Sequence, residues 1–118
     1  MGLFDKLFGK KTNEKQNEES EQAVIVRFNY GIQSLDPLHK FEKILEKIII
    51  DKNVGEYDGH EIAVDYSDGI LYMYGPNAEI LFKTIKDTLE KTTFMKGAVA
   101  TIRFGPPEEG VSEISITI

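Results

Sequence analysis

Acidic side chains and one histidine gather in a short stretch near the middle of the 118-residue chain. The stretch holds Glu56, Asp58, His60 and Glu61. Carboxylate oxygens and imidazole nitrogens are common ligands of divalent metals. In an extended chain, Glu56, Asp58 and His60 would lie on one side. The stretch is therefore a candidate binding loop, and a solvated turn is the competing interpretation.

The same stretch gives little support for catalysis. Its spacing matches neither an EF-hand loop nor a His-x3-His pair. His60, Asp58 and Ser67 supply a base, an orienting acid and a nucleophile by type, but no nucleophile-elbow glycine motif surrounds Ser67. No phosphate-binding glycine loop or dinucleotide fingerprint occurs. We therefore assign no catalytic residue, no metal ligand and no cofactor, and the sequence leaves enzymatic activity open.

The chain's only two arginines, Arg27 and Arg103, form the second candidate site. Alternation in the strands that hold them places both on the sheet face turned away from the helices, on neighbouring strands and side by side. Tyr72 and Tyr74 share a parity on a third strand and join them. Such a face binds a protein partner or a second copy, binds a small anionic or stacked ligand, or pairs locally with acids of the same face.

These sites depend on a predicted order of strand, helix, two strands, helix and two strands. Alternation or helical spacing of apolar residues indicates each element, and Asp68-Gly69 is a hairpin-turn signal. This order predicts an α+β domain, a ferredoxin-like βαββαβ sandwich with an extra C-terminal edge strand and two helices on one face of an antiparallel sheet. The strands are expected at 23–30, 61–65, 70–74, 97–104 and 111–118, and the helices at 37–50 and 78–91.

Residues 1–22 differ from this domain, which we place at 23–118. Leu3, Phe4, Leu7 and Phe8 share one face of a short helical pattern, and residues 12–22 contain no apolar side chain. The segment is expected to be a polar linker behind an amphipathic start. Its four apolar side chains would give weak peripheral contact with a membrane or docking to a protein groove, and a passive tail is the alternative.

Composition excludes several classes of protein. The absence of cysteine rules out disulfides and thiolate chemistry and fits a cytoplasmic protein. A net charge of −6 argues against nucleic-acid binding, which depends on cationic contacts to phosphate. No apolar run approaches the ~20 residues that span a bilayer, so no transmembrane segment is expected.

Three stretches together resemble a family of small uncharacterised bacterial proteins with a ferredoxin-like α+β domain. They are Gly55-Glu56-Tyr57-Asp58-Gly59-His60-Glu61, Leu71-Tyr72-Met73-Tyr74-Gly75-Pro76 and Arg103-Phe104-Gly105-Pro106-Pro107. The similarity covers about residues 23–118. It implies a bacterial cytosolic protein and carries over no functional residue.

Two functions remain as hypotheses. The first is a non-enzymatic binding or regulatory domain that acts through protein–protein contact, for which a basic partner would suit the acidic charge. The alternative is a small-molecule or divalent-metal binding domain, with or without catalytic activity, that uses the loop from Glu56 to Asp68. A concave pocket converging on His60 and the acids would favour the alternative, and a flat, apolar-rimmed face around Arg27, Arg103 and Tyr72 would favour protein contact.

Overall fold

The computed structural model describes residues 21–118 of the chain. Leu3, Phe4, Leu7 and Phe8, with the amphipathic start and linker predicted for residues 1–22, lie almost entirely outside these residues. The described chain forms, in order, β1 (Gln22–Asn29), α2 (Asp36–Lys52), β2 (Glu56–Ile62), β3 (Asp68–Gly75), α3 (Ala78–Lys91), a short 3-10 helix η1 (Thr93–Met95), β4 (Val99–Arg103) and β5 (Glu113–Thr117).

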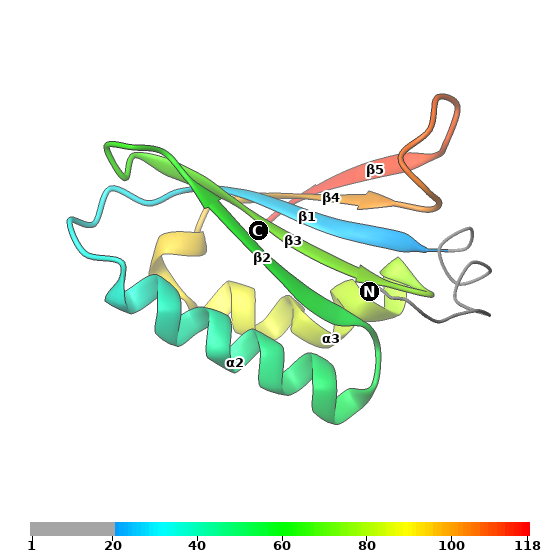
Figure 1. Cartoon of the computed structure of the whole chain (residues 1–118), viewed down its shortest axis with the longest axis horizontal. Coiled ribbons are helices and arrows are strands. Elements are labelled where there is room, and N and C mark those ends of the chain that lie inside the picture. Colours follow the sequence, from blue (N-terminus) through cyan, green and yellow to red (C-terminus); the bar gives the residue numbers. More distant parts are fainter. Residues whose placement is uncertain (1–20) are drawn as a thin grey trace, which may run out of the picture.

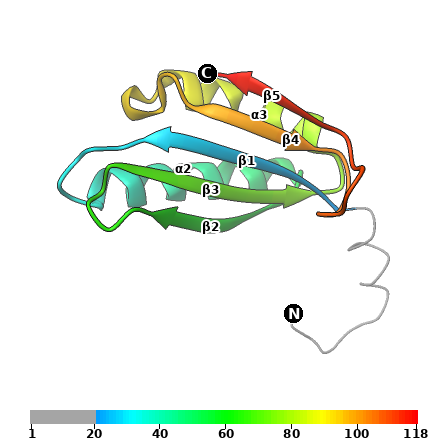
Figure 2. The same cartoon turned by 90° about the horizontal axis from the view of Figure 1, so that it is seen from above.

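The five strands form one antiparallel sheet in the order β2-β3-β1-β4-β5 (Figure 2). Both long helices pack on the same face of this sheet, α2 beside β2 and α3 beneath β1, β3 and β4 (Figure 1). The opposite face carries no helix or strand of the described residues. The protein is therefore an α+β structure with two helices on a five-stranded antiparallel sheet, which is compatible with a ferredoxin-like fold.

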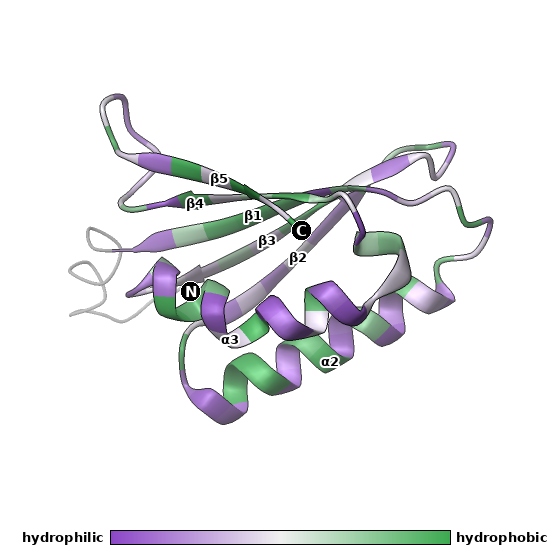
Figure 3. Ribbon diagram, turned by 180° about the vertical axis from the view of Figure 1, so that it is seen from behind, coloured by the Kyte–Doolittle hydropathy of each residue, from purple (hydrophilic) through white to green (hydrophobic). Residues whose placement is uncertain are grey.

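The core lies between this sheet and the two helices. Along β1, Val24, Val26 and Phe28 are buried while Arg27 and Asn29 are exposed, which confirms the predicted alternation. The helices contribute stripes at helical spacing, visible as hydrophobic and hydrophilic bands in Figure 3. Their buried residues are Leu38, Phe41, Leu45 and Ile49 on α2 and Ala78, Leu81, Phe82, Ile85 and Leu89 on α3.

Local signals mark where α3 begins and where α2 ends. Asn77 caps α3, because its side chain accepts a hydrogen bond of 3.0 Å from the Ile80 N–H. Asn53 ends α2 in a left-handed conformation (φ 55°), and its N–H donates to Ile50 O at 3.0 Å. β2 and α3 therefore both begin at the end of the sheet where β3 finishes, next to Gly75.

The β2–β3 hairpin differs from the sequence prediction. The strand expected near residues 61–65 is β2 and begins at Glu56, so the predicted binding loop from Glu56 to Glu61 is a strand. The turn does not lie at Asp68-Gly69, since both residues belong to β3. The chain reverses before them, where Ala63 N–H donates to Asp68 O at 2.9 Å and Tyr66 takes a positive φ of 63°.

Candidate functional site

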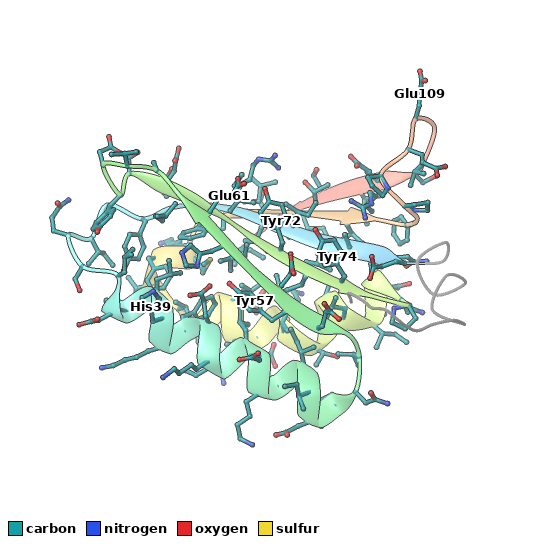
Figure 4. The ribbon with its side chains drawn as sticks, viewed as in Figure 1. His39, Tyr57, Glu61, Tyr72, Tyr74 and Glu109 are labelled. Atoms are coloured by element: carbon teal, nitrogen blue, oxygen red, sulfur yellow. The ribbon has the colours of Figure 1, made fainter. Side chains whose placement is uncertain are left out.

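The uncovered face of the sheet brings together most of the predicted binding residues. Sheet register sets Tyr72 opposite Ile25 and Tyr74 opposite Ala23, all with side chains on this face. The Tyr72 hydroxyl donates to Glu61 Oε1 at 3.1 Å across to β2, and Figure 4 shows Tyr72 and Tyr74 one after the other along β3. We call this surface, made by the outward residues of all five strands, the open face.

The two arginines share the open face but are not side by side. Register pairs Arg27 with Val99 and Arg103 with Ala23, so the arginines are four positions apart along β1. That separation is about 13 Å. Alternation reveals which face a side chain takes, but not how far one strand slides along its neighbour. The prediction of a shared face is confirmed, and the prediction of adjacency is wrong.

The arginines also differ in exposure. Arg27 is exposed, whereas Arg103 retains 8% of its accessible surface because the β4–β5 connection folds against it. Arg103 Nε donates to Gly105 O at 2.6 Å, which ties the guanidinium to that connection. Arg103 thus anchors a loop, and Arg27 is the arginine that a binding partner can reach.

Two open cavities lie at opposite ends of the sheet. The first, of about 350 Å³, is lined by Arg27, Asn29, Asp68, Ile70 and Val99, among others. The second, of about 370 Å³, lies at the start of β2, and its lining includes Glu21, Glu56 and Tyr74. His60 lines neither cavity. A pocket converging on this histidine, which would favour the small-molecule alternative, is not among them.

The acidic stretch does not converge as the sequence suggested. The ladder between β2 and β3 shifts between Tyr57 and Gly59, so Asp58 is an extra, bulged residue. Past the bulge, the side chains change parity. Glu56 and Glu61 therefore lie on the open face with Tyr74 and Ile70, while His60 pairs with Leu71 and turns toward the helices. The predicted grouping of Glu56 with His60 is wrong.

His60 instead joins a cluster that the sequence analysis missed. Its Nδ1 lies 2.7 Å from Glu42 Oε2 on α2, and the Tyr57 hydroxyl donates to the same oxygen. Because an ionised carboxylate only accepts hydrogen bonds, Nδ1 carries the proton. The His39 ring lies 6.1 Å from the His60 ring. Tyr57 points from β2 toward α2 in Figure 4.

A sequence signal for Glu42 existed. It lies four residues after Leu38 and three before Leu45, in phase with the buried stripe of α2. A carboxylate in that phase needs a hydrogen-bonding partner, because burying an unpaired charge is costly. We call Glu42, Tyr57 and His60 the Glu42 cluster.

The electrostatics of the tyrosines follow from these contacts. Burial raises the pKa of Tyr57 well above its usual value, and the Glu42 carboxylate raises it further. On the open face, the pKa of Tyr72 is raised by desolvation and by Glu61, while Arg27 lowers it. The pKa of Tyr74 is raised by desolvation and by Asp58, while Arg103 lowers it.

We expect the Tyr57 hydroxyl to make the protein sensitive to alkaline pH. A raised folded-state pKa means that the protonated hydroxyl stabilises the fold at neutral pH, and this contribution is lost as pH rises above the unfolded-state pKa of about 10. Urea unfolding at pH 8 and pH 11 should show the wild type losing up to about 1 kcal/mol more than Tyr57→Phe, allowing for partial solvent exposure. Equal losses would contradict this role.

The Glu42 cluster lacks the remaining parts of a hydrolytic site. No serine or threonine hydroxyl is hydrogen-bonded to His60 within residues 21–118. In the same residues, no group of three or more His, Cys, Asp or Glu side chains is arranged to hold a metal ion. The hydrogen bonds of the Glu42 cluster join the edge strand β2 to α2.

Comparisons with family models, with curated proteins and with solved structures find no match to this chain. Among the described helices, none has the length and apolar character needed to cross a bilayer.

Proposed function

We propose that this protein is a non-enzymatic binding or regulatory domain that acts through protein–protein contact on the open face of its sheet. The observation that carries the proposal is that half-buried Ile25, Tyr72 and Tyr74 lie together on a face without a described covering element, with exposed Arg27 two positions beyond Ile25 on β1. Tyrosine and arginine are enriched at protein interfaces and dominate their binding energy.

The distribution of charge on the open face also supports this proposal. Its centre is uncharged, with Ile25 flanked by Tyr72 and Thr101 on the neighbouring strands. Acids stand toward its margins, at Glu56, Glu61, Asp68 and Glu113. A weakly polar centre with a charged rim is the usual anatomy of a protein interface. The partner we infer therefore carries a basic rim, and its association is faster at low salt.

The small-molecule and metal alternative has no comparable support. It requires Glu56, Asp58 and His60 to converge, and the bulge in β2 turns His60 away from the two acids. As part of the proposal, we take the domain to be a ferredoxin-like βαββαβ core with β5 as an added edge strand, in a bacterial cytoplasmic protein. The family resemblance stays a prediction.

Capture of partners on the full-length chain tests this function. We expect Arg27→Glu and Tyr72→Ala each to weaken retention of proteins from the cells that make this chain by about tenfold or more. Lys40→Glu is the matched control, since it makes the same charge change at an exposed position on α2, away from the open face. If the proteins retained by the wild type are retained equally by Arg27→Glu and Tyr72→Ala, the proposal is wrong.

A further inference from the structure

The two outer strands of the sheet differ in how their edges are protected. β2 carries Glu56, Asp58 and Glu61 and is bulged at Asp58. Charges and bulges are the means by which natural sheets prevent edge-to-edge pairing. β5 has the sequence Glu-Ile-Ser-Ile-Thr with one charge, and its ladder with β4 runs without a shift. Among the described elements, β4 alone is in contact with β5 (Figure 2).

The backbone of β5 presents regular hydrogen-bonding groups at this edge. Ile118 donates its N–H to Ala98 O at 2.8 Å and accepts from Gly97 N–H at 3.2 Å. In an antiparallel ladder, every second residue directs both groups to the same neighbour. The backbone N–H and C=O groups of the even-numbered residues of β5 are therefore directed at β4. The residues whose N–H and C=O face outward are Glu113, Ser115 and Thr117.

We propose that two copies of this chain pair through β5, antiparallel about a two-fold axis at Ser115, so that their sheets become continuous. In this register Glu113 lies opposite Thr117 of the second copy, and Ser115 lies opposite its own counterpart. All three outward residues of each strand then exchange backbone hydrogen bonds. This dimer uses the edge of the sheet and leaves the open face available.

Side chains favour this register over its neighbours. Ile114, which is 49% exposed, comes to lie opposite Ile116 of the second copy on the helix side, where each side chain covers part of the other's apolar surface. Moving the axis to Glu113 would oppose two carboxylates, which is destabilising. Moving it to Ile114 or Ile116 leaves only two of the three outward residues paired within β5. The strand is thus complementary to itself about Ser115.

The contact between two five-residue strands is small. Stable protein interfaces bury roughly 1,200–2,000 Å² in total, more than a strand pair of this length supplies. We therefore expect a reversible dimer whose population rises with concentration.

Sedimentation velocity of the full-length chain over a range of concentrations tests the pairing. We expect a dimer that Ser115→Pro weakens by about tenfold or more. Proline removes an outward N–H and takes no hydrogen bond from the β4–β5 ladder, so the monomer keeps its fold by circular dichroism. A wild type that stays monomeric up to about millimolar concentration, at which weak pairing of about −4 kcal/mol would show, overturns the proposal.

A pair of charge variants tests the register itself. Thr117→Lys sets an ammonium opposite Glu113 twice in the dimer and should tighten it roughly twofold to thirtyfold, while Thr117→Glu should weaken it by a similar factor. Thr93→Lys, at an exposed position on η1, controls for net charge. If Thr117→Lys changes dimerisation no more than Thr93→Lys does, this register is wrong.

Two further measurements distinguish this edge from the open face. Amide exchange should slow with concentration at Glu113, Ser115 and Thr117 but not at Ile114 and Ile116, whose N–H groups already bond to β4. Arg27→Glu should leave dimerisation unchanged whether or not the open face binds a partner. Dimerisation that Arg27→Glu abolishes and Ser115→Pro spares would place the contact on the open face and overturn the edge proposal.

Discussion

Replacing Gly55 with alanine is expected to lower the free energy of unfolding by about 3 kcal/mol or more. Gly55 has a φ of 154°, and a Cβ there would lie 2.2 Å from the carbonyl oxygen of Tyr74. Both the conformation and the space therefore exclude a side chain, and the obstacle is backbone that cannot rotate away. Strain of this kind costs about 1–3 kcal/mol, and overpacking adds a similar amount.

Gly59→Ala provides the matched control for this prediction. Gly59 also has a positive φ, of 143°, but nothing lies within 4 Å of the position its Cβ would take. Its loss should be confined to the conformational part, about 1–3 kcal/mol. Urea unfolding followed by circular dichroism measures both variants. Equal losses would show that the close approach of Gly55 to β3 contributes nothing.

The position of Gly55 links this prediction to the open face. The residue joins α2 to β2, and its close neighbour Tyr74 is one of the open-face tyrosines. Any shift that relieves the clash moves Tyr74 or the start of β2. Gly55→Ala is therefore also expected to weaken partner binding on the open face, beyond its effect on stability.

The helices and β1 could be predicted from the sequence because burial is periodic there. Leu38, Phe41, Leu45 and Ile49 fall on one side of a 3.6-residue repeat, and packing against the sheet agrees with that repeat. In β1, buried and exposed residues alternate strictly from Val26 to Asn29. In these segments the local pattern of apolar residues and the tertiary packing favour the same secondary structure.

The start of β2 at Glu56 could not be predicted because its pattern does not come from burial. It is an edge strand of mostly polar residues, and pairing with β3 makes it a strand. The bulge at Asp58 then reverses the parity of every later residue, so His60 faces α2 although counting from Glu56 places it on the open face. The turn predicted at Asp68-Gly69 was wrong because pairing within the sheet places both residues in β3. Gly69 is a strand residue where the Phe28 ring packs closely, and a Cβ would lie 2.8 Å from that ring.

The distance between the two arginines also could not be predicted from the sequence. Parity gave the face of Arg27 and Arg103 correctly, but the register of β1 with β4 is a long-range pairing that the sequences of the two strands do not reveal. Predicting the Glu42 cluster would have required knowledge of both the bulge in β2 and the packing of α2 against β2. Long-range pairing of this kind is decided by the whole sheet, and no local pattern encodes it.

Glu42→Ala is expected to destabilise the protein by about 2–4 kcal/mol, the second large effect. The carboxylate accepts from the Tyr57 hydroxyl and from His60 Nδ1, and hydrogen bonds to a charged group contribute about 1.5–3 kcal/mol each before allowance for partial exposure. Glu46→Ala is the control, one turn later on α2 and exposed, and should change stability by at most about 0.5 kcal/mol. A double-mutant cycle with Tyr57→Phe measures the coupling.

The loss of stability in Glu42→Ala should affect β2 before it affects the rest of the fold. Among the helices of the described chain, α2 alone contacts β2, and the Glu42 cluster supplies the side-chain hydrogen bonds that join them. Without Glu42, amide exchange should accelerate throughout β2 while β1 and β4, in the middle of the sheet, exchange at wild-type rates relative to global unfolding. If exchange rises uniformly over all strands, Glu42 stabilises the fold as a whole. If only β2 responds, the edge that carries Glu56 and Glu61 can open independently, and the rim of the open face on that side is adjustable.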